Sequence, residues 1–505
     1  MQKELYQIER SEVSLNISEG AVTEVRRKHI VRSGCRVYDG GKLGISGVFG
    51  EPDEATWQAA QRALTAGLSH PEPLGALVRS RETGVMPEER ELLEQSEALL
   101  AHLREECPGF VFSNKIVALS ERVRLENDLG RRLNDRQSGS FLNLVVKDEA
   151  SPNVFDTGIG WTSRGNAAID GLEAARRSLR AYRNEVPMPK EKLPVLFAGS
   201  FLSGKLEGLL DVQKLESGAS LFSGKMGEKL FSGALTLQVD RRPESWLPFF
   251  DAEGSVLEGD TLPLIENGVL VRGAADRAQA ARYGCMATAA AGGAYDAAPC
   301  RSASEGCLRI AQTHSYAELL GDRSFILIDV ASGGDMTPAG DFATPVQTAY
   351  LCRDGLPVGR LPEFSFRGSV FDLLGGGFLG RTDGGPLGGV LFHEFQPGGG
   401  VVEQVPHHHG GAQGAARLLH RPGHAPLQGQ GGPQRGILGA AHHVDAGDGG
   451  NGGQCLPPEP QGADGLQVIL RAQLAGGVAE KGGLRLGGGD AAAVVADAKI
   501  GHAAV

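Results

Sequence analysis

Alternating and periodic hydrophobic positions divide the first 370 residues into predicted strands and helices. Residues 12–18 and 21–32 alternate as strands do, and residues 35–50 hold two extended runs around a turn at Asp39-Gly40-Gly41. Apolar positions at helical spacing predict helices over 53–68 and 87–106. Pro87, followed by acidic residues, predicts that the second helix has Pro in its first turn.

The same patterns continue beyond residue 110. They predict strands across 110–161, a long amphipathic helix over 168–186, and further strands within 233–240, 262–273, 324–330 and 345–361. Asn267-Gly268 and Asp354-Gly355 predict hairpin turns. The fold class predicted is α+β. We expect a mixed α/β N-terminal domain at 1–190 and a β-rich domain with a barrel-like sheet at 191–374.

The segment PVLFAGSFLSGKLEGLL, residues 194–210, has the order of a nucleotide-binding P-loop. An apolar run, a glycine loop, Gly204-Lys205 and leucines at helical spacing follow one another. Leu206, however, stands where a P-loop has the Ser or Thr that holds magnesium. The missing hydroxyl argues against a nucleotide site.

Residues 375–505 differ in composition from the rest of the chain. Roughly half of the 74 glycines and nine of the 13 histidines follow Val370, and Ser, Tyr, Trp and Met are absent there. The segment has too few large apolar residues to build a core. We interpret it as a disordered low-complexity tail or the product of a shifted reading frame, and the loss of serine favours the second. Sequencing the gene distinguishes them.

Charge and targeting signals narrow the function classes. The 505-residue chain has a net charge of −11, which argues against nucleic acid or an anionic membrane as partner. It has no apolar run long enough to span a membrane and no signal-peptide pattern at its start. The seven scattered cysteines are typical of reduced thiols. We therefore expect a soluble, cytoplasmic protein.

Common catalytic motifs are missing. His393 precedes a glutamate, but no second histidine follows at ligand spacing and Pro397 would break the required helix. The histidines at 407–409 and 442–443 lie in glycine-rich sequence without a scaffold, and no Gly-x-Ser-x-Gly motif occurs. Asp335 and Asp341 are interpreted as part of a solvated loop between strands rather than a cation site. Composition and spacing alone indicate no catalytic centre.

Four blocks, in order, resemble the TldD/PmbA family over about residues 12–374. They are GCRVYDGGKLGISGV, the central GASLFSGKMGEKLFSGALTLQVD with Ser220, FDAEG followed by LPLIENGVLVRGAADRAQAARYG, and the late PAGDFATPVQTAYLCRDGLPVGRL. Tyr38 departs from the family pattern, which has glycine at that position.

The resemblance also locates the family's metal motif. In the TldD branch a helix before the central block carries His-Glu-x-x-x-His, which with a late cysteine resembles a zinc site. Counted back from Ser220, those three positions fall on Ser203, Gly204 and Gly208. None of these residues can ligate zinc well or act as the base. The late cysteine motif is absent too, because Cys455 lacks matching context.

The vacated motif resembles the PmbA branch, also called TldE, whose members pair with a TldD-type subunit. The resemblance implies a cytoplasmic heterodimeric metalloprotease that digests unfolded or flexible peptides, with zinc in the TldD-type partner and no catalytic or metal-binding residue here. The chain would help bind an extended peptide, for which strand addition to the C-terminal sheet suffices. The family's older label as a modulator of DNA gyrase does not imply DNA binding in a chain of this charge. Two alternatives remain: a stand-alone peptide-binding or scaffold protein, and a damaged product whose core folds poorly.

Overall fold

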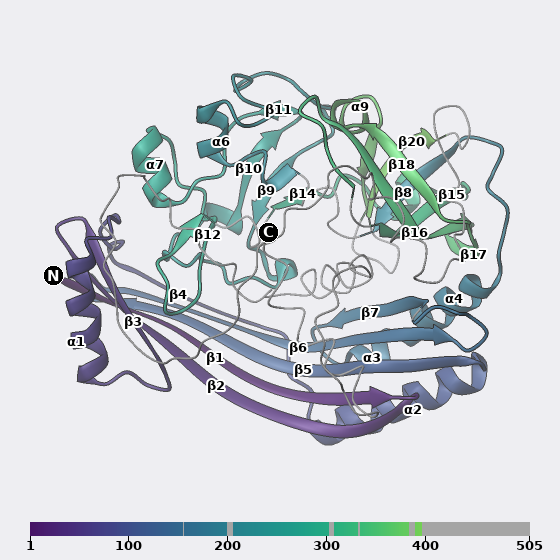
Figure 1. Ribbon diagram of the computed structural model, residues 1–505, viewed down its shortest axis with the longest axis horizontal. Coiled ribbons are helices and arrows are strands. Elements are labelled where there is room, and N and C mark those ends of the chain that lie inside the picture. The colour runs from purple at the N-terminus through teal and green to yellow at the C-terminus, as the bar shows by residue number, and fades with distance from the viewer. Residues whose placement is uncertain (155, 199–205, 302–307, 332–333, 383–388, 396–505) are drawn as a thin grey trace, which may run out of the picture. The chain divides into compact units, whose positions relative to one another are not determined.

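A computed structural model describes residues 1–395, apart from 155, 199–205, 302–307, 332–333 and 383–388. The described chain combines long strands with a smaller number of helices, so the predicted α+β class is confirmed (Figure 1). None of the helices in these ranges is both long enough and apolar enough to cross a membrane. The predicted tail lies outside the described residues beyond Phe395.

One sheet carries the N-terminal part of the chain. Its strand order is β3-β2-β1-β5-β6-β4, and β7 also pairs with β6. Neighbouring strands are antiparallel except β4, which runs parallel to β6. Strand β1 begins ten residues before the alternating segment at 12–18. The strands are β1 Gln2–Ser18, β2 Ala21–Asp39, β3 Lys42–Phe49, β4 Leu77–Thr83, β5 Phe110–Asn127, β6 Arg131–Asp148 and β7 Thr157–Ser163.

Two predicted helices cover this sheet. Helix α1, Glu54–Ala63, packs Ala60 against Cys35 and Val37 of β2. Helix α2, Glu89–Glu106, buries Leu92, Leu99, Leu100 and Leu103 in a core with strands β1, β5 and β6. The predicted start of α2, at residue 87, is two residues too early. Glu88 is its N-cap, so Pro87 lies before the helix and not in its first turn.

The amphipathic helix predicted over 168–186 is in fact two helices. Helix α3, Ala167–Asp170, and helix α4, Leu172–Arg183, meet at Gly171. Glycine has low helix propensity. A Cβ added to Gly171 would also lie 3.0 Å from the Cβ of Trp161 on β7, so the break lets the chain approach the sheet closely.

The C-terminal part contains open sheets. One has the order β17-β16-β15-β8-β20-β19 with β18 paired to β16, a second has the order β11-β10-β9-β14, and β12 pairs with β13. Each has edge strands, so the expected barrel-like closure is wrong for the described residues. The strands are β8 Leu193–Ala198, β9 Leu237–Asp240, β10 Thr261–Glu266, β11 Val269–Leu270, β12 Ala291–Gly292, β13 Cys300–Arg301, β14 Leu308–Ile310, β15 Phe325–Ala331, β16 Asp341–Arg353, β17 Leu356–Arg360, β18 Phe364–Ser369, β19 Phe378–Arg381 and β20 Gly389–Phe395.

Short helices connect these strands: α6 Val212–Ser217, α7 Arg277–Tyr283, α8 Tyr316–Leu319 and α9 Val370–Leu374. The predicted domain boundaries at 190 and 374 stay predictions. Strands β19 and β20 follow Leu374 and pair with each other, and β20 also pairs with β8.

The three predicted hairpin turns are confirmed. Each has two central residues with positive φ, as a type I′ turn requires, and this explains the Asn, Asp and Gly found there. The φ angles are 57° and 73° at Gly40 and Gly41, 49° and 81° at Asn267 and Gly268, and 49° and 74° at Asp354 and Gly355.

Strand β8 explains the apolar run that opens the P-loop-like segment. Val195 and Phe197 belong to the core of the C-terminal sheets, whereas Leu196 packs into the core that α2 and α4 share with the N-terminal sheet. A strand buried on both faces has no polar alternation. The predicted buried strand is therefore confirmed.

Candidate functional site

The structure describes one of the three positions at which the resemblance locates the metal motif. Ser203 and Gly204 lie outside the described residues, whereas Gly208 is half-buried in the segment that leads to α6. The Nζ of Lys214 on α6 lies 3.5 Å from where a Cβ on Gly208 would stand. A side chain at this position would therefore face an ammonium group, which repels a metal cation.

The serine of the central block is tied to the same segment. The Ser220 hydroxyl donates a hydrogen bond to Leu209 O at 2.5 Å and accepts one from Phe222 N at 3.1 Å. Ser220 is buried, so its role is to hold the central block against the chain next to Gly208.

Other candidate ligands do not assemble within the described ranges. No group of three or more His, Cys, Asp and Glu side chains lies close enough there to hold a metal ion. His393 lies on strand β20, not on the helix that a zinc protease motif needs. Asp341 opens β16 and is exposed, as is Asp335 in the turn before it. The histidines at 407–409 and 442–443, and Cys455, lie outside the described residues.

The cysteines depart from expectation in one place. Cys35, Cys107, Cys285 and Cys352 carry free thiols, as predicted. Cys300 is disulfide-bonded, so the prediction that all seven are reduced is wrong for this residue. Burial raises the pKa of the Cys352 thiol to about 12, which makes it unreactive.

The best-defined polar site lies where residues 241–256, which we call the junction loop, pack against the N-terminal sheet. This loop connects β9 to β10 and carries three aromatic side chains. Phe249 and Phe250 share a core with Tyr6, Val123 and other sheet residues. The Trp246 ring lies tilted against that of Phe141, with ring centroids 5.0 Å apart.

A glycine in the sheet makes room for the tryptophan. A Cβ on Gly139 of β6 would lie 2.6 Å from the Cη2 of Trp246 and 2.2 Å from Ser163 O. Any larger residue would therefore push the loop away from the sheet. The guanidinium of Arg164 completes the contact by lying 3.5 Å from the Trp246 ring centroid.

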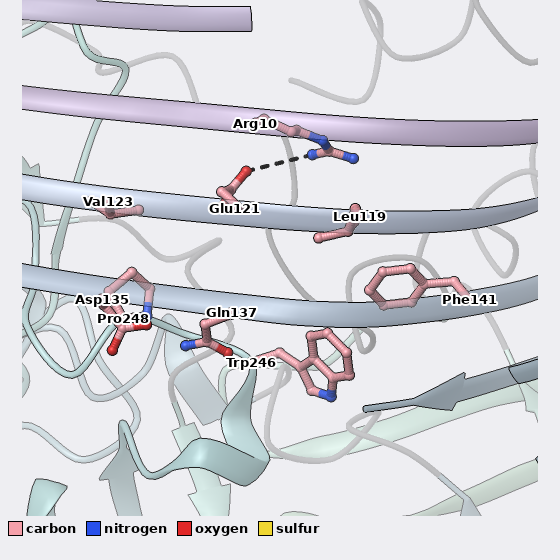
Figure 2. Close-up of a pocket in the computed structure, with 9 residues that line it drawn as sticks. All are labelled: Arg10, Leu119, Glu121, Val123, Asp135, Gln137, Phe141, Trp246 and Pro248. Carbon is pink, nitrogen blue, oxygen red and sulfur yellow. Dashed lines mark ion pairs between the residues drawn. The ribbon is translucent and has the colours of Figure 1, made fainter. Parts of the chain in front are cut away.

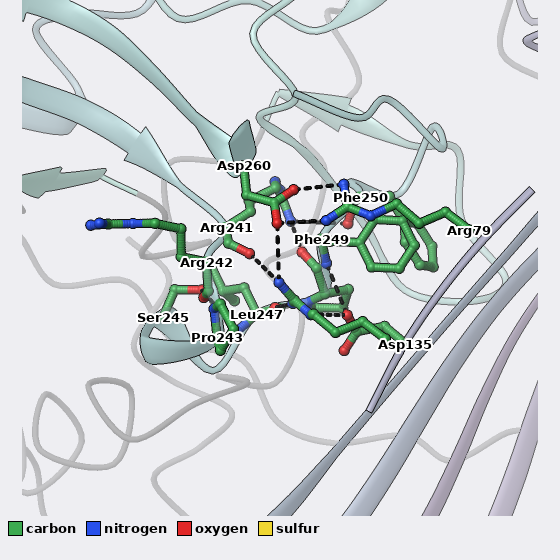
Figure 3. Close-up of polar contacts among 12 residues, drawn as sticks. Arg79, Asp135, Arg241, Arg242, Pro243, Ser245, Leu247, Phe249, Phe250 and Asp260 are labelled. Atoms are coloured by element: carbon green, nitrogen blue, oxygen red, sulfur yellow. Dashed lines mark hydrogen bonds and ion pairs between the residues drawn. The ribbon is translucent and has the colours of Figure 1, made fainter. Parts of the chain in front are cut away.

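Two arginines of β4 hold the segment between β9 and β10, Arg81 through carbonyl groups of the junction loop and Arg79 through Asp260 (Figure 3). Arg81 donates to Arg241 O and Leu247 O, both at 2.6 Å, and pairs with Asp135 of β6 at 2.7 Å. Burial raises the pKa of the Asp135 carboxyl. Arg79 forms a bidentate pair with Asp260, at 2.8 and 2.6 Å. Bidentate pairs fix orientation as well as distance.

Arg241, the first residue of the junction loop, donates hydrogen bonds to carbonyl groups of the loop itself. Its side chain is almost fully buried, with Nε donating to Ala289 O at 2.8 Å. Its Nη1 donates to Pro248 O at 3.1 Å and Phe250 O at 3.0 Å. The loop is therefore held by arginines on both sides, from the sheet and from its own first residue.

A small cavity lies between the junction loop and the sheet (Figure 2). It has a volume of about 30 Å³ and is lined by Arg10, Glu121, Asp135, Gln137 and Trp246, among others. A space of this size holds a water molecule or two, not a peptide. Asp135 Oδ1 has no hydrogen-bond partner in the described structure, so water in this cavity would satisfy it.

A buried cluster of acids forms where the loop turns at Asp251-Ala252-Glu253-Gly254. Asp251 Oδ1 accepts from Glu253 N at 3.0 Å and Ser255 N at 2.8 Å, and its Oδ2 accepts from Ala291 N at 3.2 Å. Glu253 Oε2 accepts from Arg277 N at 2.9 Å, at the start of α7. Both carboxyls are almost fully buried.

Residues of the N-terminal part face this cluster. His70, in the loop between α1 and β4, places its Nε2 3.3 Å from Glu253 Oε1. Arg36 of β2 donates to Ala252 O at 2.6 Å and to Glu4 Oε1 at 3.2 Å. Tyr38 also donates to Glu4 Oε1, at 3.0 Å. The cluster therefore joins the two parts of the chain by buried polar contacts.

The pKa values of two carboxyls in and beside the cluster, Asp251 and Asp276, are raised. Burial, and then the charge of Glu253, raise the pKa of Asp251 to about 7. Burial also raises the pKa of Asp276, the N-cap of α7. Perturbed groups of this kind often mark functional sites. Here His70, Asp251, Glu253 and Asp276 are each at most 5% exposed, which leaves no access for a substrate, so the cluster holds the junction together.

Sequence reasoning missed this junction. His70 belongs to no recognised motif, and Asp251 and Glu253 were noted only as part of the FDAEG block. The available signal was the placement of two acids directly after Phe249-Phe250, because acids in an apolar run require buried partners.

Comparisons with known proteins identify one domain of the chain. Residues 191–377 match the PmbA/TldA metallopeptidase C-terminal domain. A metalloprotease of Methanocaldococcus jannaschii is 25% identical over 284 residues, which cover 52% of this chain and 59% of that protein. The chain thus spans less than two thirds of this relative.

Two solved structures share the fold over most of the described chain. The crystal structure of TldE from Thermococcus kodakarensis gives a TM-score of 0.59 at 19% identity, over 78% of this chain and 96% of TldE. A Thermotoga maritima structure named for modulation of a DNA gyrase gives a TM-score of 0.60 at 18% identity, over 78% of this chain and 95% of that one. Residues 191–377 thus belong to the PmbA/TldA metallopeptidase C-terminal domain family, and the chain shares the fold of these two structures.

Proposed function

We propose that this chain is the PmbA/TldE-like, non-catalytic subunit of a cytoplasmic TldD/PmbA metalloprotease. The observation that carries the proposal is the residue set at the metal-motif positions, Ser203, Gly204 and Gly208. Two of these residues have no side chain, and serine is a poor zinc ligand. Lys214 beside the Gly208 position adds to this argument. The zinc and the base of peptide hydrolysis then come from a TldD-type partner.

The substrate of the proposed complex is an unfolded or flexible peptide, bound in extended form. The path of paired strands in the larger C-terminal sheet runs from β17 to β19. On β17, the backbone N–H of Arg360 donates to Asn184 O at 2.8 Å, and the backbone carbonyl of Arg360 accepts from Val186 N at 2.9 Å. At the opposite end, Arg381 of β19 accepts from Thr313 N at 3.1 Å. The peptide is proposed to add to an edge of this sheet through main-chain hydrogen bonds, which need no special side chains.

Coexpression tests the proposal. The full chain and a TldD-type subunit are coexpressed, purified through a tag on this chain, and passed over a size-exclusion column. An unstructured peptide is then the substrate, with and without a zinc chelator. We expect a stable complex with chelator-sensitive activity, which disappears when the glutamate of the partner's His-Glu-x-x-x-His motif becomes glutamine.

Two results contradict the proposal. One is chelator-sensitive cleavage by this chain alone, and the other is failure to form a complex. A chain that binds unstructured peptide but forms no complex would support the stand-alone peptide-binding or scaffold function instead.

A further inference from the structure

The long strand β2 has an open edge over half its length. Strand β1 pairs with β2 from end to end on one side. On the other side β3 pairs only with residues 32–39. Residues 21–31, which we call the β2 edge, therefore end the sheet, as Figure 1 shows for the strand lying outside β1.

The direction of the free backbone groups follows from one hydrogen bond. Val31 O accepts from Gly50 N at 2.8 Å, on the side away from β1. Because both backbone groups of alternate residues in an antiparallel strand point to one side, Val25, Arg27 and His29 direct theirs to the same side. Within the described ranges none of these three residues has a backbone partner there.

The side chains of this edge are mostly basic and exposed. Residues 21–32 contain four Arg or Lys and one Glu, in a chain with a net charge of −11. Arg26, Arg27 and Lys28 pair with Glu24, Glu89 and Glu12, and their side chains are 51%, 65% and 55% exposed. Ion pairs this exposed contribute little stability, so the three cations can exchange partners at small cost.

The charges decide what can pair with this edge. A second copy of the chain, added antiparallel, would bring two such runs of cations together, and like charges across a strand pair are destabilising. Charges on an edge commonly prevent self-association in this way. A strand rich in Asp and Glu would instead form hydrogen bonds with the free backbone groups and ion pairs with the cations.

We propose that the β2 edge accepts an extended acidic strand of the metal-binding partner subunit. The inference rests on the proposed function, because it names the surface through which that subunit is held. The strand adds next to Val25, Arg27 and His29 by main-chain hydrogen bonds, and Arg26 and Lys28 pair with its acids. Mixed charge pairing of this kind selects the heteromeric complex over self-association.

Two matched pairs of variants test the edge in coexpression with the TldD-type subunit. Arg27→Pro removes an outward N–H and blocks the edge, whereas Arg27→Ala loses the same side chain and keeps the N–H. Arg26→Glu/Lys28→Glu reverses the edge charge, and Arg62→Glu/Arg90→Glu reverses two exposed charges on helices α1 and α2 instead. Thermal unfolding of each isolated variant verifies that it folds.

We expect Arg27→Pro and Arg26→Glu/Lys28→Glu each to weaken the complex by about tenfold or more, equivalent to one or two lost hydrogen bonds. Arg27→Ala and the helix double variant stay within about twofold of wild type, as surface substitutions do. If wild type forms the complex and all four variants bind equally well, the β2-edge inference is wrong and the proposed function stands. If wild type forms no complex, both are wrong.

Discussion

His70 Nε2 lies 3.3 Å from Glu253 Oε1, inside the contact between the N-terminal sheet and the junction loop. His70 Nδ1 lies 2.9 Å from Pro71 O, which can only accept, so Nδ1 carries a hydrogen. A neutral ring of that tautomer has a lone pair on Nε2. It faces Glu253 Oε1 in a buried space, and neither atom has a hydrogen-bond partner among the described residues.

The first prediction concerns this pair. His70→Ala removes the only side-chain contact described for Glu253 Oε1 and is expected to destabilise the chain by about 3 kcal/mol, the usual cost of breaking a buried pair. Urea unfolding of His70→Ala, Glu253→Gln and the double variant measures the coupling. We expect a coupling energy above about 1 kcal/mol. Purely additive effects would show that the contact does no more than fill space.

The second prediction concerns pH. The pKa of Asp251 is raised from about 3.9 in the unfolded chain to about 7, so its contribution to stability is complete below pH ~4. That contribution is lost as the pH rises toward 7, because ionisation then costs the folded state. The urea midpoint of wild type should decrease as the pH increases from 5 to 7.5. In Asp251→Asn the decrease over the same pH range should be smaller.

Asp240→Asn is the control for this prediction. Burial alone would raise the pKa of Asp240, but hydrogen bonds from Arg242 outweigh it and lower the pKa. Its stabilising effect is therefore lost only at lower pH, as the carboxyl becomes protonated. Asp240→Asn should leave the slope between pH 5 and 7.5 unchanged. An equal slope in wild type and Asp251→Asn would refute the assignment of the pH effect to Asp251.

The third prediction concerns the aromatic side chains of the loop. Phe249 is fully buried, and Phe249→Ala is expected to cost about 3–5 kcal/mol through lost burial and a cavity. Phe49, which is 70% exposed, supplies the control, because Phe49→Ala should change stability by less than about 0.5 kcal/mol. Chemical unfolding measures both. Similar costs for the two would mean that Phe249 does not anchor the loop.

The fourth prediction concerns Arg81. Arg81→Ala leaves Asp135 and two loop carbonyls without this donor, so we expect faster protease cleavage within residues 241–256. Arg90→Ala is the control, since Arg90 is 86% exposed and pairs only with Glu94 among the described contacts. Mass spectrometry of the fragments locates the cuts. Identical cleavage patterns would contradict the role given to Arg81.

Local sequence patterns predicted most of the elements. The hairpin at Asn267-Gly268 and the buried strand Val195–Phe197 follow from short-range rules that packing did not override. The break at Gly171 was missed because it depends on the approach of Trp161, a contact that no local pattern records. The expected barrel was wrong because strand order is set by long-range pairing.

The junction could not be predicted in the same way. His70 and Glu253 are 183 positions apart, and nothing in either neighbourhood indicates the other. The predicted motif positions were located by family resemblance alone, and the hydrogen bond from Ser220 to Leu209 ties the reference serine to the chain beside Gly208. Side chains that act across the fold are found only when the fold is known.

The central claim is that peptide hydrolysis in the complex comes from a metal site outside this chain. Its most direct test is chelator-sensitive peptidase activity in three samples: this chain alone, the TldD-type subunit alone, and the purified complex. We expect no activity from this chain and full activity from the complex, abolished by the partner's glutamate-to-glutamine change. Chelator-sensitive cleavage by this chain alone would contradict the account.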